Sequence, residues 1–193
     1  MNQDFEVDIT DEQVVSFQEN GFLSIDRVTT GTEIEWMRGL YDQLFDDRWG
    51  EKEGRYFDLG GQRAHTGKDV LPQILGPETR FPELRETGYF RNAVTITARL
   101  LDVESSTVSG GGHMILKPGG YGRETPWHQD EAYWNPHELP NRLSAWLPLD
   151  PATLESGCLQ FIPKSHKGEV VDHRHVDNDP LVHTLVADHV DSR

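Results

Sequence analysis

The pattern of apolar residues changes near residue 105, and this change limits the possible folds more than any other feature of the sequence. Before that point, apolar side chains recur every three or four residues, the period of an amphipathic helix. Beyond it, short apolar stretches alternate with clusters of Gly, Pro, Asn and Asp, as in an antiparallel barrel or jelly roll. The order predicts an α+β domain, helical over about 1–104 and β over about 105–193. The expected strands are His113–Leu116, Leu143–Leu149, Cys158–Ile162 and Leu181–Val186.

Start and stop signals predict a helix close to the N-terminus. Thr10 and Gln13 have the spacing of a capping box, in which each residue bonds the other's backbone N–H. Asn20-Gly21 is a typical helix stop, because Gly readily adopts the left-handed conformation that ends a helix. A strand over Phe22–Ile25 is expected to follow.

Two more helices are predicted in the first half. The last of them follows Pro82, a residue tolerated in a first helical turn, and covers Leu84–Leu101. Residues 50–80 are rich in Gly, charged residues and turn formers, so they are predicted to be mostly irregular with one or two short strands. The other helix begins near Thr32, and its core-facing side is expected to consist of Ile34, Met37, Tyr41, Leu44 and Phe45.

Length and charge narrow the possible functions. A chain of 193 residues suits one domain, 1–193, with a substantial core. Its net charge of -15 would repel nucleic-acid phosphates and anionic lipid headgroups. The start, MNQDFEVDITDEQ, lacks the features of a signal peptide, and no apolar run approaches the ~20 residues needed to cross a bilayer. We therefore expect a cytoplasmic protein whose partner is a small-molecule substrate, with no nucleic acid or membrane partner.

The cysteine content restricts the kind of metal site that the chain could form. Cys158 is the only cysteine, so neither an internal disulfide nor a thiolate cluster is possible. Its apolar neighbours favour a small packed side chain over a nucleophile. Any metal must therefore be held by His and carboxylate ligands.

The segment TPWHQDEAYWNP, residues 125–136, contains the strongest candidate for such ligands. On a strand, residues i and i+2 share a face, so His128 and Asp130 would point together while Trp127 and Gln129 point away. Two His and one carboxylate on one face of an octahedral metal, with the other positions open, define the non-haem Fe(II) oxygenase site. The spacing predicts two of these three ligands.

The same spacing also occurs at His175/Asp177 and His189/Asp191, so spacing alone is weak support. Both of those pairs lie in a polar stretch without aromatic neighbours, and we expect them to be solvated surface. The pair in residues 128–130 differs because aromatic and Pro side chains could enclose a metal there: Pro126, Trp127, Tyr133 and Trp134.

Three longer strings resemble the phytanoyl-CoA dioxygenase family of Fe(II)- and 2-oxoglutarate-dependent oxygenases. They are TDEQVVSFQENGFLSI, HMILKPGGYGRETPWHQDEAYW and SAWLPLDPATLESGCLQFIPKSHKG, which together cover much of the chain in the family's order. The resemblance implies N-terminal helices packed on a double-stranded β-helix, or jelly-roll, core. It also implies Fe(II), 2-oxoglutarate as co-substrate and O₂.

Carried over to this sequence, the resemblance makes His128 and Asp130 iron ligands. It places Trp146 beside 2-oxoglutarate, and His113 near a position that lines the co-substrate pocket. The implied reaction hydroxylates an aliphatic C–H bond of a small organic substrate while 2-oxoglutarate is decarboxylated to succinate. The presence of Asp130 favours hydroxylation over halogenation, since related halogenases leave this position to a halide. Family members act on acyl-CoA thioesters, compatible solutes and natural-product intermediates, and the sequence does not choose among them.

Other motif residues carry weaker implications. Gln129 should face away from iron, either as an outward polar residue or as a donor to a ligand. Lys164 and His166 match a family loop of largely structural role, and Gly157 meets a backbone requirement of its turn.

The sequence departs from the family near its C-terminus. The family's third ligand is a distal His, followed by an Asn and then by an Arg that pairs with 2-oxoglutarate. His183 and Arg193 have a suggestive separation, but LVHTLVADHVDSR lacks the Gly-Asp turn before the His and the Asn after it. We expect the β core to be incomplete, with the distal ligand lying beyond residue 193 and with weak activity of this chain alone.

Two alternatives to an oxygenase remain open. One is a jelly-roll binding or scaffold domain without catalysis, which the missing distal His and Arg favour. The other is a cupin-like metalloprotein that uses Mn or Zn without 2-oxoglutarate, although cupin sites gather several His in one short motif.

Overall fold

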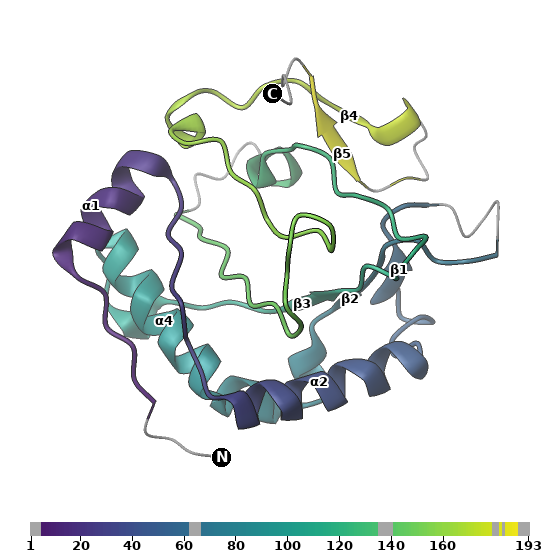
Figure 1. Cartoon of the computed structure of the whole chain (residues 1–193), viewed down its shortest axis with the longest axis horizontal. Helices are drawn as coiled ribbons and strands as arrows, with labels where there is room; N and C mark the ends of the chain where they lie inside the picture. The colour runs from purple at the N-terminus through teal and green to yellow at the C-terminus, as the bar shows by residue number, and fades with distance from the viewer. Residues whose placement is uncertain (1–4, 62–66, 135–140, 179–181, 183, 189–193) are drawn as a thin grey trace.

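The computed structural model describes residues 5–61, 67–134, 141–178, 182 and 184–188. These residues form a mixed α+β structure, with helices along two sides of the view, one small sheet running from its centre to the right, and a second small sheet at the upper right (Figure 1). Among them, no helix is long and apolar enough to cross a membrane. The α-helices are α1 (Asp11–Asn20), α2 (Gly31–Asp46) and α4 (Gly88–Leu101).

Helix α1 confirms the predicted start and stop signals. The Thr10 hydroxyl accepts a hydrogen bond from the Gln13 N–H at 3.2 Å, and the Gln13 side chain accepts one from the Thr10 N–H at 2.9 Å. Gly21 ends the helix with φ 86°, and its N–H donates to the Phe17 carbonyl at 2.7 Å. The half-buried Phe17 packs against a core cluster that includes Ile96 of α4.

Helix α2 buries the face that its apolar spacing predicted. Met37, Leu44 and Phe45 are buried, and the last two form a core cluster with Tyr56 and Ile74. The predicted helix over Leu84–Leu101 begins later, as α4. Because the Thr87 side chain caps it by accepting from the Phe90 N–H at 3.1 Å, the preceding residues Pro82–Glu86 form a separate 3₁₀ turn, η2.

Two short antiparallel sheets complete the structure. In the first, β2 (Pro72–Leu75) lies between β1 (Tyr56–Asp58) and β3 (His113–Ile115), as predicted for residues 50–80 and for the first stretch of the second half. In the second, β4 (His173–His175) pairs with β5 (Leu185–Ala187). Strand β5 overlaps the end of the predicted strand Leu181–Val186, which partly lies outside the described residues.

The predicted strands at Phe22–Ile25, Leu143–Leu149 and Cys158–Ile162 are wrong. A strand needs a neighbouring backbone, and side chains take that place for the 143–149 segment. The carbonyls of Ala145 and Leu149 accept hydrogen bonds from the side chains of Tyr89 and Arg38. The other two segments contact each other through aromatic side chains, since the rings of Phe22 and Phe161 are stacked with their centroids 4.8 Å apart.

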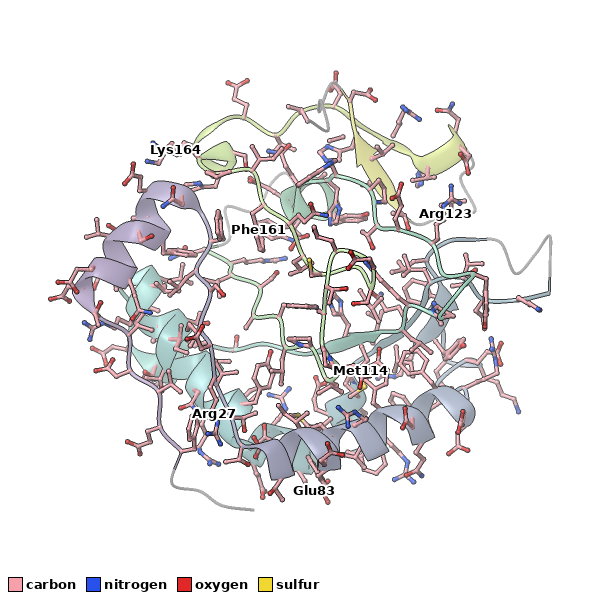
Figure 2. All side chains as sticks on the ribbon, in the orientation of Figure 1. Arg27, Glu83, Met114, Arg123, Phe161 and Lys164 are labelled. Atoms are coloured by element: carbon pink, nitrogen blue, oxygen red, sulfur yellow. The ribbon has the colours of Figure 1, made fainter. Side chains whose placement is uncertain are left out.

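The loop of residues 162–168, IPKSHKG, docks on the end of α1. Figure 2 shows Lys164 beside this end of the helix. The Lys164 ammonium pairs with Glu19 at 3.0 Å, and its backbone N–H donates to the Asn20 carbonyl at 3.0 Å. His166 Nε2 lies 3.1 Å from the Gln18 carbonyl. These contacts give the loop a structural role, as the resemblance implied.

Candidate metal centre

His128 and Asp130 converge although they do not lie on a strand. Residues 121–129 are irregular, and Asp130 begins the 3₁₀ turn η4 (Asp130–Tyr133), so the strand assumed for this segment is wrong. Gln129 between them has extended backbone angles, φ -111° and ψ 126°, which put its two neighbours on the same side. His128 Nε2 consequently lies 3.3 Å from Asp130 Oδ1.

The second polar atom of each side chain has its own partner. His128 Nδ1 lies 2.9 Å from the Pro126 carbonyl, a contact in which Nδ1–H donates and Nε2 is left for another group. Asp130 Oδ2 accepts a hydrogen bond from the Ser144 hydroxyl at 2.9 Å. The carboxylate thus directs only Oδ1 toward the imidazole.

The two groups shift each other's protonation. The hydrogen bond from His128 lowers the pKa of Asp130 against the opposing effect of burial, with smaller contributions from the Ser144 bond and the charges of His128 and His113. The hydrogen bond to Asp130 raises the pKa of His128, again against burial. Both shifts favour the ion pair of a protonated imidazole and an ionised carboxylate, with one proton between Nε2 and Oδ1, and a metal cation could take the place of that proton.

The geometry fits a shared cation. Two ligand atoms bound at right angles to one metal, each at about 2.1 Å, are separated by about 3 Å. The observed 3.3 Å between Nε2 and Oδ1 is close to this value. The Tyr133 ring covers the imidazole edge-on, with ring centroids 5.9 Å apart. Within the described part of the chain, no group of three or more His, Cys, Asp or Glu side chains could hold a metal, so this pair supplies two ligands.

The two residues predicted to line the co-substrate pocket lie on separate segments. His113 starts β3, is exposed, and lies close enough for its charge to lower the pKa of Asp130. Trp146 is 49% exposed and follows Ser144 by two residues, so its backbone lies near the carboxylate. Their roles toward 2-oxoglutarate stay predictions.

Gln129 faces away from the pair, as predicted, and joins it to the segment before β4. Its side-chain amide donates to the Glu169 carbonyl at 3.3 Å and accepts from the Val171 N–H at 2.9 Å. Its backbone N–H donates to His173 Nε2 at 3.0 Å. In this arrangement Gln129 is a structural bridge, and the engaged His173 Nε2 is not available to a metal.

The competing His175/Asp177 pair is on the surface, as expected. Both residues are exposed; His175 Nδ1 contacts the Val182 carbonyl at 2.7 Å, and Asp177 pairs with Arg123 at 2.7 Å. The other candidates of the C-terminal stretch lie outside the described residues: His183, His189, Asp191 and Arg193.

Sequence reasoning missed two residues around the site. Ser144 contacts Asp130 directly, and the Tyr89 hydroxyl donates to the carbonyl of the adjacent Ala145 at 2.8 Å. The only signal for Ser144 was its place at the start of the SAWLPLD string. Nothing in the sequence pattern distinguished Tyr89 from other half-buried aromatic residues of a helix.

Comparisons with known proteins identify the family and the fold. The phytanoyl-CoA dioxygenase family model matches residues 17–185. The crystal structure of EvdO2 from Micromonospora carbonacea var. aurantiaca complexed with 2-oxoglutarate superposes with a TM-score of 0.76 and 36% identity, over 97% of this chain and 76% of that one.

Two curated relatives are phytanoyl-CoA dioxygenase domain-containing proteins. The protein from Bos taurus is 43% identical over 56 residues, or 29% of this chain and 19% of the relative. The homolog from Dictyostelium discoideum is 25% identical over 189 residues, or 82% of this chain and 66% of the relative. The chain thus spans less than two thirds of either relative. From the family match and the solved structure together, this chain belongs to the phytanoyl-CoA dioxygenase family of Fe(II)- and 2-oxoglutarate-dependent oxygenases.

Proposed function

We propose that His128 and Asp130 hold Fe(II) and that the chain serves the 2-oxoglutarate-dependent hydroxylation of an aliphatic C–H bond in a small organic substrate. The observation that carries this proposal is the 3.3 Å approach of Nε2 to Oδ1, with the far atom of each side chain already engaged. The likeness to a structure complexed with 2-oxoglutarate supports the choice of co-substrate.

The chain's own residues orient and enclose the metal position. Bound iron would supply the activation of O₂ coupled to oxidation of 2-oxoglutarate. The Pro126 carbonyl fixes the imidazole so that Nε2 faces the metal, and Tyr133 shields one side of the ring from water. Among the described residues no third His, Cys, Asp or Glu side chain joins this pair, so any further protein ligand would come from outside them.

Trp146 and His113 are proposed to border the co-substrate. The half-exposed indole of Trp146, two residues after Ser144, offers a flat apolar face to a ligand, and the charge of His113 acts on Asp130. Both features suit a small dicarboxylate bound at the proposed metal site.

We also infer that residues 1–193 form one domain whose second half belongs to a double-stranded β-helix. The strands that pair in the structure are short and do not by themselves define this fold. The inference is supported by the TM-score of 0.76 to the EvdO2 structure over 97% of the chain. The net charge of -15 favours a small-molecule substrate over nucleic acid. We also propose that the protein is cytoplasmic.

The test is a spectroscopic titration without oxygen. Fe(II) and 2-oxoglutarate added to the full chain should produce a weak visible charge-transfer band, which Asp130→Ala and His128→Ala should abolish. His175→Ala is the matched control, because His175 has the same spacing to a carboxylate but lies on the surface. Trp146→Phe should weaken 2-oxoglutarate binding while leaving metal affinity unchanged.

A binding domain without catalysis is the second candidate. It is favoured by the finding that the described residues contain no group of three or more His, Cys, Asp or Glu side chains that could hold a metal. Metal binding that depends on Asp130 without a charge-transfer band would favour a cupin-like metalloprotein. Absence of both metal binding and the band would favour the scaffold function.

A further inference from the structure

The two oxygens of the Asp130 carboxylate have different partners. Oδ1 faces His128 Nε2 at 3.3 Å, whereas Oδ2 accepts the Ser144 hydroxyl hydrogen bond at 2.9 Å. We propose that Ser144 is a positioning residue that reserves Oδ1 for the metal and makes Asp130 a one-oxygen ligand, and that Tyr89 holds Ser144 in place. This inference rests on the metal site proposed above and goes further by assigning positioning roles to Ser144 and Tyr89, which are not metal ligands.

A carboxylate can bind a metal through one oxygen or through both. A hydroxyl that donates to one oxygen competes with the metal for its lone pairs and fixes the plane of the carboxylate. One-oxygen binding leaves an additional coordination position, which a reaction that brings both a co-substrate and O₂ to one metal requires. Ser144 would thus keep a position open as well as strengthen the hold on the metal.

Ser144 owes its position to a contact from α4. Residues 143–149 do not pair in a strand, and the Tyr89 hydroxyl donates to the carbonyl of Ala145, the next residue, at 2.8 Å. Burial raises the pKa of Tyr89 to about 12, so its hydroxyl remains a donor at neutral pH. The hydrogen bond fixes the backbone one residue from the hydroxyl that contacts Asp130.

Tyr89 is in turn fixed at the first turn of its helix. The Glu33 carboxylate of α2, only 4% exposed, accepts hydrogen bonds from the Gly88 N–H at 2.8 Å and the Tyr89 N–H at 3.0 Å. Its negative charge also suits the N-terminus of α4. The series of contacts connects the helical half of the molecule with the metal ligand.

The experiment measures Mn(II) and Co(II) affinity of the full chain without oxygen, with Ser144→Ala, Ser144→Thr and Tyr89→Phe compared to wild type. Loss of a hydrogen bond to a metal ligand typically costs about 10–100-fold in metal affinity, and we expect Ser144→Ala to fall in this range. Ser144→Thr keeps the hydroxyl and should restore affinity. Tyr89→Phe keeps the ring and should give a smaller loss. The exposed Ser105→Ala is the matched control.

A second readout separates positioning from a general effect on folding. If Asp130 binds through both oxygens in Ser144→Ala, the visible Co(II) absorption should change in shape and intensity, whereas Ser144→Thr should match wild type. Unchanged metal affinity and an unchanged Co(II) spectrum in Ser144→Ala would overturn the role assigned to Ser144 but not the proposed function. So would a loss that Thr does not restore and that accompanies a fall in Tm. Equal binding by wild type and Asp130→Ala would overturn the proposed function, and this inference with it.

Discussion

The two halves of the molecule keep their apolar side chains in different environments. In the helical half, residues such as Leu44 and Ile74 are almost fully buried in clusters that join helices to the first sheet. In the second half, Leu154 is 70% exposed and Phe161 53%. The candidate ligands therefore lie in the half that leaves more of its large apolar side chains exposed, next to a half with more fully buried ones. The region with the most fully buried apolar side chains is therefore not the region that contains the candidate metal ligands.

The largest effect should come from matched truncations in the two halves. Leu44→Ala removes a side chain that is 2% exposed and should lower the free energy of unfolding by about 2–5 kcal/mol. Leu159→Ala, at 47% exposed, should cost less than about 1 kcal/mol. Urea denaturation of both variants checks this, and equal losses would show that the second half is packed as tightly as the first.

Metal binding should stabilise the protein through the second half alone. Mn(II) at 100 times its dissociation constant should add about 2.7 kcal/mol to the free energy of unfolding. In Asp130→Ala, at the same metal concentration, the gain should fall below about 1.4 kcal/mol, the value left by a tenfold loss of affinity. Thermal melting with and without Mn(II) measures the gain, and His175→Ala should keep all of it.

The contact between α1 and the IPKSHKG loop offers a test of how the halves are joined. Gly21 has φ 86°, and a Cβ there would lie 2.3 Å from His166 Nδ1. Gly21→Ala should cost about 1–2 kcal/mol from the backbone conformation, and more from the clash. The same substitution in a His166→Ala background should cost less, because the clash is gone. Identical costs in a double-mutant cycle would mean that the loop does not dock in solution.

The smallest effect should come from a surface ion pair. Arg123 and Asp177 lie 2.7 Å apart, with the carboxylate side chain 68% exposed. Asp177→Asn should change stability by less than about 1 kcal/mol, and less still at high salt, because water and ions screen exposed charges. A larger loss in urea denaturation would reveal that this contact is a main support of the second half.

The sequence predicts the helices better than the strands, because the contacts that form a helix join residues close together in the sequence. The Thr10 capping box and the apolar face of α2 are formed by residues three or four apart, so their outcome was predictable. A strand needs a partner strand that can lie far away in the sequence. The segment Leu143–Leu149 has no such partner among the described residues, and its carbonyls bond side chains of α2 and α4.

The site was also predicted in part. The spacing of His128 and Asp130 indicated that they share a face, and the extended backbone of the residue between them preserved this outcome without a strand. Ser144 could not be predicted in the same way, because its contact joins residues 14 apart through an irregular segment. A hydroxyl has no sequence periodicity that indicates such a contact.

The three hydrogen bonds made by Gln129 have a thermodynamic consequence for metal capture. Its N–H and both ends of its side-chain amide are engaged, by His173, Glu169 and Val171. The torsions between the two candidate ligands are therefore restricted before any cation arrives. A chelating pair that is preorganised in this way loses little conformational entropy on binding, because the ordering cost is met during folding. In the proposed metal site, Gln129 would contribute to metal affinity by limiting the conformations of the two candidate ligands, although its own side chain points away from them.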